Sequence, residues 1–215
     1  MIYSHEDLLS RWNDGNPLVT LAAELGIQVQ VIAFLRPFSQ LMFGTYSQMM
    51  KQRFDAFAAA GAAYDGMTFE DLVTHIAPRY EVDSFLNQWA DRFPGLRAAH
   101  SDAIRAEIEG LLNTDDLDWD VPHALTNPSL RVHDCDHIAT LIRDGKTPIE
   151  ELRAEYAAAH HRIGQPDEGR TAERIAMVDT VFARRIAGLI KHYNIDLRPA
   201  APSPTPTPTQ APILP

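Results

Sequence analysis

The chain has 215 residues, and 45% of them are hydrophobic, which suits a folded domain with a buried core and excludes an intrinsically disordered chain. The net charge of −10 argues against general binding to nucleic acid, because such binding needs clustered lysine and arginine. A single cysteine, Cys135, excludes an intramolecular disulfide, and the first residues lack the basic start and apolar core of a secretory signal. We therefore expect a cytoplasmic protein.

Helical periodicity runs through residues 1–198 and predicts one all-α domain, a single-domain helical bundle. The predicted helices, in chain order, cover residues 6–12, 39–60, 68–76, 82–93, 98–112 and 169–194. The third begins with a capping pattern, Thr68-x-x-Asp71, and the last carries one apolar stripe at steps of three and four residues. No run of alternating apolar and polar residues in the sequence indicates a strand.

The most apolar stretch of the sequence covers residues 27–43. It includes polar or helix-breaking residues, among them Gln28, Gln30, Arg36, Pro37 and Gln40. That is more polarity than a bilayer span of roughly 20 apolar residues tolerates. The pattern favours a buried pair of helices broken at Pro37.

The last seventeen residues, 199–215, include seven prolines and differ in composition from the rest of the chain. Proline favours extended, unpaired backbone, so this segment cannot build a core of its own. We predict a disordered tail, and the alternative is a proline-motif ligand for a partner domain.

A His-Asp-x-x-His segment near the middle of the chain has the spacing of a metal site. His133 and His137 are at positions i and i+4 of a predicted helix, so their imidazoles project from one face about 6 Å apart. Asp134 lies about 100° round the helix, where it can reach the same ion or hydrogen-bond a ligand. The flanking residues are apolar, which indicates a partly buried site where an unpaired charge would be costly. A divalent ion would compensate that charge.

A second predicted helix follows this segment after a short loop that begins at Gly145, and it supplies the next carboxylates. Thr147 and Glu150 match a capping box, with Pro148 in the first helical position. Because Glu150 already has this local role, we predict Glu151 as the fourth ligand, with Glu150 as its substitute. Two imidazoles with one or two carboxylates suit zinc holding an open position, and also iron or manganese. The alternative is an ordinary hydrogen-bonded surface cluster.

Two neighbouring residues have simpler interpretations. Cys135 lies between Asp134 and Asp136, whose carboxylates raise the pKa of a thiol and argue against an activated thiolate. His160 falls near the apolar face of the second helix, and we expect it at the edge of the core rather than in a pocket.

The segment of about residues 130–163 resembles a family of ubiquinone (coenzyme Q) biosynthesis proteins, which carries a His-Asp-x-x-His motif and a Glu after eleven intervening residues. His133, Asp134 and His137 match that motif. The match ends there, since Glu150 follows after twelve residues and Glu151 after thirteen. The resemblance implies an all-helical fold and a divalent metal, usually zinc, on the four motif residues. It also implies a role in organising ubiquinone synthesis and in removing the ring carboxylate of prenylated precursors, with hydroxylation at the same carbon.

The same resemblance implies partners. The ligand would be a hydrophobic or prenylated small molecule, held in a groove of apolar helices that includes residues 34–43. Peripheral membrane contact and assembly into a homo-oligomer or a biosynthetic complex would accompany it. Residues 1–112 show no likeness to the family, which leaves a different substrate open.

Two other classes of function remain open from the sequence. A metal-dependent phosphohydrolase of the HD type needs an upstream histidine, here His100 or His123, then the His133–Asp134 pair and a distant carboxylate, here Asp179. The His133–Asp134 pair does not end a long apolar helix, and this favours a metal-binding protein like the ubiquinone-biosynthesis family over a phosphohydrolase. A helical scaffold or binding protein fits the proline-rich tail and the lack of a Gly-x-Ser-x-Gly nucleophile signature.

Overall fold

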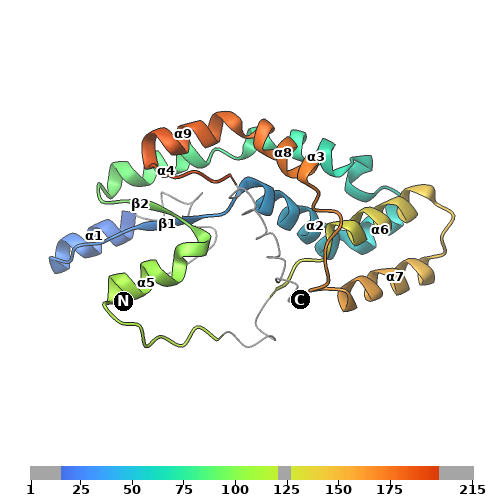
Figure 1. Cartoon of the computed structure of the whole chain (residues 1–215), viewed down its shortest axis with the longest axis horizontal. Coiled ribbons are helices and arrows are strands. Elements are labelled where there is room, and N and C mark those ends of the chain that lie inside the picture. The colour runs from blue at the N-terminus through green and yellow to red at the C-terminus, as the bar shows by residue number, and fades with distance from the viewer. Residues whose placement is uncertain (1–15, 121–126, 199–215) are drawn as a thin grey trace, which may run out of the picture.

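The computed structural model describes residues 16–120 and 127–198, and this part of the chain is mostly helical, as the composition and periodicity predict (Figure 1). The helices are α1 (Asn16–Leu25), α2 (Phe38–Ala60), α3 (Phe69–Ile76), α4 (Val82–Arg92), α5 (Ile104–Leu112), α6 (Val132–Asp144), α7 (Ile149–His161), α8 (Ala172–Val181) and α9 (Ala183–Tyr193). Three 3-10 turns, η3 (Ala63–Gly66), η4 (Ala77–Arg79) and η5 (Ser101–Ala103), lie between them. The predicted helix at 6–12 and the tail at 199–215 lie outside the described residues.

Helix α2 forms the centre of the core. Its buried apolar side chains recur at steps of three and four and comprise Phe38, Met42, Phe43, Tyr46, Met50, Phe54 and Phe57. Helices α6 and α8 and the turn η3 pack against this helix. Aromatic rings connect these elements, because Tyr46 stacks on Tyr64 with 4.0 Å between ring centroids, and Phe38 stacks on Phe182 at 4.2 Å. The helix predicted at 39–60 is confirmed.

Two short strands are present where the sequence indicated none. Strand β1 (Ile32–Leu35) pairs in parallel with β2 (Arg97–His100), with Ile32 opposite Arg97. The buried helix pair predicted over residues 27–43 is therefore wrong, since a strand precedes Pro37 and only one helix follows it. Proline disfavours helical backbone in the preceding residue, and Pro37 itself stands at the N-cap of α2. Likewise, the helix predicted from residue 98 begins only at Ile104.

The C-terminal apolar stripe is divided between two helices. Phe182 has φ −93° and ψ 5°, so α8 ends before it and α9 begins after it. Its ring is fully buried on Phe38, and this tertiary contact coincides with the break. At the start of α3, the capping box predicted for Thr68 and Asp71 is confirmed.

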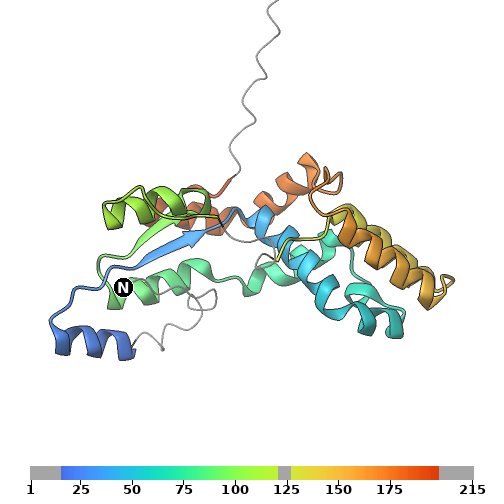
Figure 2. The same ribbon diagram turned by 90° about the horizontal axis from the view of Figure 1, so that it is seen from below.

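Helices α6 and α7 form an antiparallel hairpin that lies at the opposite end of the molecule from α1 and α5 (Figures 1 and 2). Gly145 ends α6 with φ 66°, a left-handed conformation that glycine adopts without strain. The capping box predicted for Thr147 and Glu150 is wrong. Pro148 is the N-cap of α7, and in the described residues it has no side-chain cap bond.

In the described part of the chain, no helix combines the length and apolar character needed to cross a bilayer.

Candidate metal centre

The three motif residues meet in one pocket between the first turns of α6 and the last turns of α7. The pocket has a volume of about 300 Å³. Its lining comprises two guanidiniums, two imidazoles and two carboxylates, from Arg131, His133, Asp134, His137, Glu155 and Arg162. The i, i+4 spacing of the histidines therefore brings both imidazoles to the same cavity, as the sequence predicts.

The loop after α7 returns to fix the start of α6. One carboxylate oxygen of Asp167 accepts a hydrogen bond from the Val132 amide at 2.8 Å, and the other accepts from the His133 amide at 3.2 Å. Partial burial raises the pKa of Asp167, but these backbone N–H groups outweigh it and hold the pKa below its ordinary value. Gly169 packs so closely that an added Cβ would lie 2.4 Å from the His133 nitrogen. The backbone of His133 is thus held by a loop that the sequence did not single out.

Asp134 is the buried member of the cluster, with 3% of its surface exposed. Its Oδ1 accepts a hydrogen bond from Arg162 Nε at 2.9 Å. Its Oδ2 has no hydrogen-bond partner in the described part of the chain and lies 3.7 Å from Arg131 Nε, which is also unpartnered there. This ion pair with Arg131 is the contact that compensates Oδ2 among the described residues, and a buried carboxylate oxygen without a hydrogen bond is costly.

Three further side chains lie at the more open side of the pocket. His133 and His137 are exposed, and His137 Nε2 lies 3.9 Å from Glu155 Oε2. Glu155 also forms an ion pair with Arg162 Nη2 at 3.7 Å. The sequence analysis missed Glu155, although its position one helix across from His137 follows from an antiparallel hairpin.

The two carboxylates that the sequence favoured lie elsewhere. Glu150 and Glu151 are exposed in the first turn of α7, and the described lining of the pocket includes neither. The first turn of α7 follows the loop directly, so it lies beside the last turn of α6. The histidines occupy the opposite end of α6. The structure therefore brings together His133, Asp134 and His137, with Glu155 in place of Glu151.

A polar network lies on the other face of α6. Asp136 accepts hydrogen bonds from the Tyr46 hydroxyl at 2.9 Å and from Arg174 Nη1 at 2.6 Å. Arg174 Nε also donates to Glu70 at 2.8 Å, so one guanidinium joins α3, α6 and α8. Burial and the Asp136 carboxylate raise the pKa of Tyr46, which stays a neutral donor. This network holds the helix that carries the motif.

Cys135 behaves as the sequence predicts, whereas His160 is exposed on α7. Cys135 is fully buried, and burial, followed by the Asp136 and Asp134 carboxylates, raises its pKa to about 12. The His160 ring packs edge-on against Tyr156 with 4.8 Å between centroids. Burial, followed by the charge of Lys51, lowers the pKa of His160. The raised pKa keeps the Cys135 thiol protonated at neutral pH, which argues against an activated thiolate.

The upstream histidine and the distant carboxylate considered for a phosphohydrolase do not join His133 and Asp134 in the described pocket lining. His100 lies at the end of β2, where its ring accepts a hydrogen bond from the Asp102 amide at 3.2 Å. Asp179 is on α8, and like His100 it is absent from the described pocket lining. His123 lies outside the described residues.

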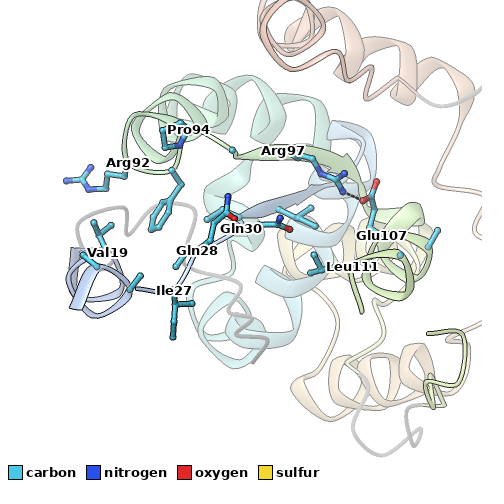
Figure 3. Close-up of a pocket in the computed structure, with 18 residues that line it drawn as sticks. Val19, Ile27, Gln28, Gln30, Arg92, Pro94, Arg97, Glu107 and Leu111 are labelled. Atoms are coloured by element: carbon cyan, nitrogen blue, oxygen red, sulfur yellow. Dashed lines mark hydrogen bonds and ion pairs between the residues drawn. The ribbon is translucent and has the colours of Figure 1, made fainter. Parts of the chain in front are cut away.

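A larger hollow of about 830 Å³ lies near the strands, between α1, the β1–β2 pair and α5 (Figure 3). Its walls mix apolar side chains such as Val19 and Leu111 with polar ones such as Gln28, and an ion pair joins Arg97 to Glu107 at one side. The residues expected to form a lipid groove do not line it. Most of residues 34–43, including Phe38 and Phe43, are packed in the core instead.

The donor set of the smaller pocket fits a divalent ion. Two imidazoles and two carboxylates, one of them buried with an oxygen that has no hydrogen bond among the described residues, are ligands that zinc uses, and iron and manganese accept them too. With the side chains as they stand, the described residues contain no group of three or more histidine, cysteine or acidic side chains close enough to hold an ion. Ion binding at this site therefore needs its side chains to rearrange.

Comparisons with protein-family models, with curated proteins and with solved structures gave no match for this chain. The likeness to the ubiquinone-biosynthesis family therefore rests on the motif residues His133, Asp134 and His137. The geometry of their pocket is the basis for a proposed function.

Proposed function

We propose that this protein binds a divalent metal ion, zinc in the first instance, in the pocket between α6 and α7. His133, Asp134 and His137 are the proposed ligands, with Glu155 as the fourth. The observation that carries this proposal is Asp134 Oδ2, which has an ion pair with Arg131 but no hydrogen bond among the described residues. A nearly buried carboxylate oxygen of this kind beside two exposed imidazoles has the chemistry of a cation site.

The pocket also supports a role in chemistry on a bound small molecule. A metal ion there would polarise a carboxylate or another oxygen of that molecule as a Lewis acid. Arg131 and Arg162 line the same cavity and supply positive charge beside the ligand. The resemblance to the ubiquinone-biosynthesis family supports a prenylated aromatic carboxylate as the substrate, with decarboxylation or hydroxylation as the reaction. It also supports work beside a membrane or within a biosynthetic complex.

A second candidate function is a helical binding protein whose motif is structural. The hydrogen bond from Arg162 to Asp134 favours this candidate, because it neutralises the buried carboxylate without any ion. In such a protein the ion pair already compensates the buried carboxylate, so zinc would not change the stability of the fold.

Zinc titration of the purified, chelator-treated protein distinguishes the two candidates. Wild type should bind one equivalent of Zn²⁺ by calorimetry and melt at a higher temperature with zinc present. His133→Ala and His137→Ala should weaken binding by more than about tenfold, since each removes a ligand. His192→Ala, an exposed histidine on α9, is the matched control and should bind like wild type. Absence of stoichiometric binding by wild type would leave the structural role as the function.

A further inference from the structure

Arg162 contacts both carboxylates of the candidate metal centre. Its Nε donates to Asp134 Oδ1 at 2.9 Å, and its Nη2 lies 3.7 Å from Glu155 Oε2. The two carboxylates come from different helices, so one guanidinium bridges α6 and α7. Its side chain is 30% exposed and lines the pocket with them. Arg162 thus occupies the place, between the two carboxylates, where an ion would bind.

The bridge has a physical reason. Asp134 is too buried for water to stabilise its charge, and its other oxygen is only 3.7 Å from Arg131 Nε, beyond hydrogen-bond distance. Arg162 therefore provides the one hydrogen bond that the Asp134 carboxylate makes in the described part of the chain. Without an ion, loss of this guanidinium would leave a buried negative charge poorly compensated.

The same bridge opposes metal binding. A guanidinium and a divalent ion compete for the same carboxylate oxygens, and two cations a few ångströms apart in a partly buried pocket repel each other strongly. The ion can therefore bind Asp134 and Glu155 only when Arg162 releases them. Arg162 can release them because it follows the last residue of α7, at the C-cap, with a side chain that is 30% exposed, and a turn with Gly164 at φ 87° comes next.

We propose that Arg162 is the counter-cation of the metal-free site and exchanges with the metal ion. This inference rests on the metal centre proposed above. Arg162 stabilises the metal-free protein and weakens its affinity for the ion, so that the affinity is set by a residue that is not itself a ligand. It acts on the ion through Asp134 and Glu155, as a positioning residue.

The variant Arg162→Gln tests this exchange because glutamine removes the charge and keeps a donor. The chelator-treated variant should melt several degrees below wild type, since Asp134 loses its partner. In zinc titrations it should bind about tenfold more tightly than wild type, since a competing cation is gone. Arg153→Gln is the matched control, because it removes the same charge from an exposed position on α7 and should change neither quantity.

The outcomes separate this inference from the proposed function. Wild type that binds zinc, with Arg162→Gln binding equally or less tightly, overturns the exchange and leaves the metal centre standing. Wild type that does not bind, with Arg162→Gln binding, shows that the arginine excludes the ion, and it overturns both the exchange and the metal centre of the native protein. If neither binds, both proposals fall.

A second variant covers the case in which Arg162→Gln does not fold. Arg162→Lys keeps the charge but has no planar fork, so its ammonium contacts one carboxylate rather than two. Arg162→Lys should have a melting temperature closer to that of wild type. Its affinity for zinc should lie between the affinities of wild type and of Arg162→Gln. An affinity equal to or lower than that of wild type overturns the proposal.

Discussion

His137 on α6 and Glu155 on α7 face each other across the helical hairpin, with 3.9 Å between His137 Nε2 and Glu155 Oε2. The hairpin is antiparallel, so residues equally far from the loop become neighbours. His137 lies eight residues before Gly145, and its partner lies a similar distance beyond the loop. Glu151 lies one helical turn, about 6 Å, nearer the loop than Glu155.

This geometry predicts which carboxylate serves the metal centre. Glu155→Gln should weaken zinc binding by more than about tenfold, because a neutral amide is a poor ligand for the ion. Glu151→Gln is the control on the same helix and should bind zinc like wild type. Calorimetric titration with Zn²⁺ measures both variants. The opposite ranking, with Glu151→Gln the weaker binder, would mean that α7 shifts along α6 when the ion binds.

The close packing of Gly169 against α6 leads to a stability prediction. Alanine there would place Cβ 2.4 Å from the His133 nitrogen and 2.8 Å from the Val132 carbonyl carbon, so backbone has to move. Such overpacking costs about 1–3 kcal/mol, and Gly169→Ala should lower the free energy of unfolding by at least that amount. Gly110→Ala is the control, because Gly110 is inside α5 with open space around it and alanine favours helix. Urea unfolding compares the two, and equal effects would contradict the close contact.

The sequence predicts most of the fold because the helices bury regular stripes. Phe38, Met42 and Tyr46 repeat at helical spacing, and such a pattern is visible without knowledge of what it packs against. The strands could not be predicted, because they have no such local pattern. β1 has four residues without alternation, and its pairing partner is far along the chain. The break at Phe182 was also unpredictable, since phenylalanine is compatible with helix and the break accompanies stacking on Phe38.

The site was predictable in part. His133, Asp134 and His137 form a local pattern on one helix, so their convergence on one pocket follows from helical spacing. The identity of the fourth ligand depends on how two helices align. The prediction of Glu151 rested on a capping box between Thr147 and Glu150, and that capping box does not form. Counting outward from the loop would have found Glu155. The contacts of Asp167 and Arg162 come from a loop whose path the sequence does not specify.

The Glu70–Arg174 pair predicts a pH dependence of stability. Partial burial raises the pKa of Glu70, but hydrogen bonds from Arg174 and its charge outweigh it, so the pKa is lower than its ordinary value. A carboxyl whose pKa is lower in the folded state stabilises the fold above its unfolded pKa, and this contribution disappears as pH falls through the folded value. Glu70→Gln should therefore cost at most about 1 kcal/mol near pH 7, because the pair is partly exposed, and progressively less as the pH falls toward 3.

Urea unfolding at the two pH values measures that difference. Glu24→Gln, at an exposed position on α1, is the control and should match wild type at both. A Glu70→Gln deficit that is as large in acid as at neutral pH would show that glutamine disturbs packing instead of charge.

For Asp179 on α8 we predict a pH dependence of stability with the opposite sign to that of Glu70. Its Oδ1 is buried without a hydrogen-bond partner among the described residues, and burial, reinforced by the charge of Asp196 and opposed by Arg198, raises its pKa. A carboxyl whose pKa is raised on folding destabilises the fold once pH exceeds its unfolded value. Asp179→Asn should therefore raise the melting temperature near pH 7 and lose this advantage near pH 3. Asp196→Asn should have the reverse effect at neutral pH, because hydrogen bonds from Arg198 lower the pKa of Asp196.

Zinc titration of the same variant separates stability from function. Asp179 is not part of the described pocket lining, so Asp179→Asn should bind Zn²⁺ with the affinity of wild type. A phosphohydrolase of the HD type would need this carboxylate as a ligand, and its loss would then weaken binding by more than about tenfold. Unchanged affinity together with a raised melting temperature assigns Asp179 to the packing of α8 and places the metal centre wholly on the α6–α7 hairpin. Weakened binding would instead require α8 to approach the motif when the ion binds.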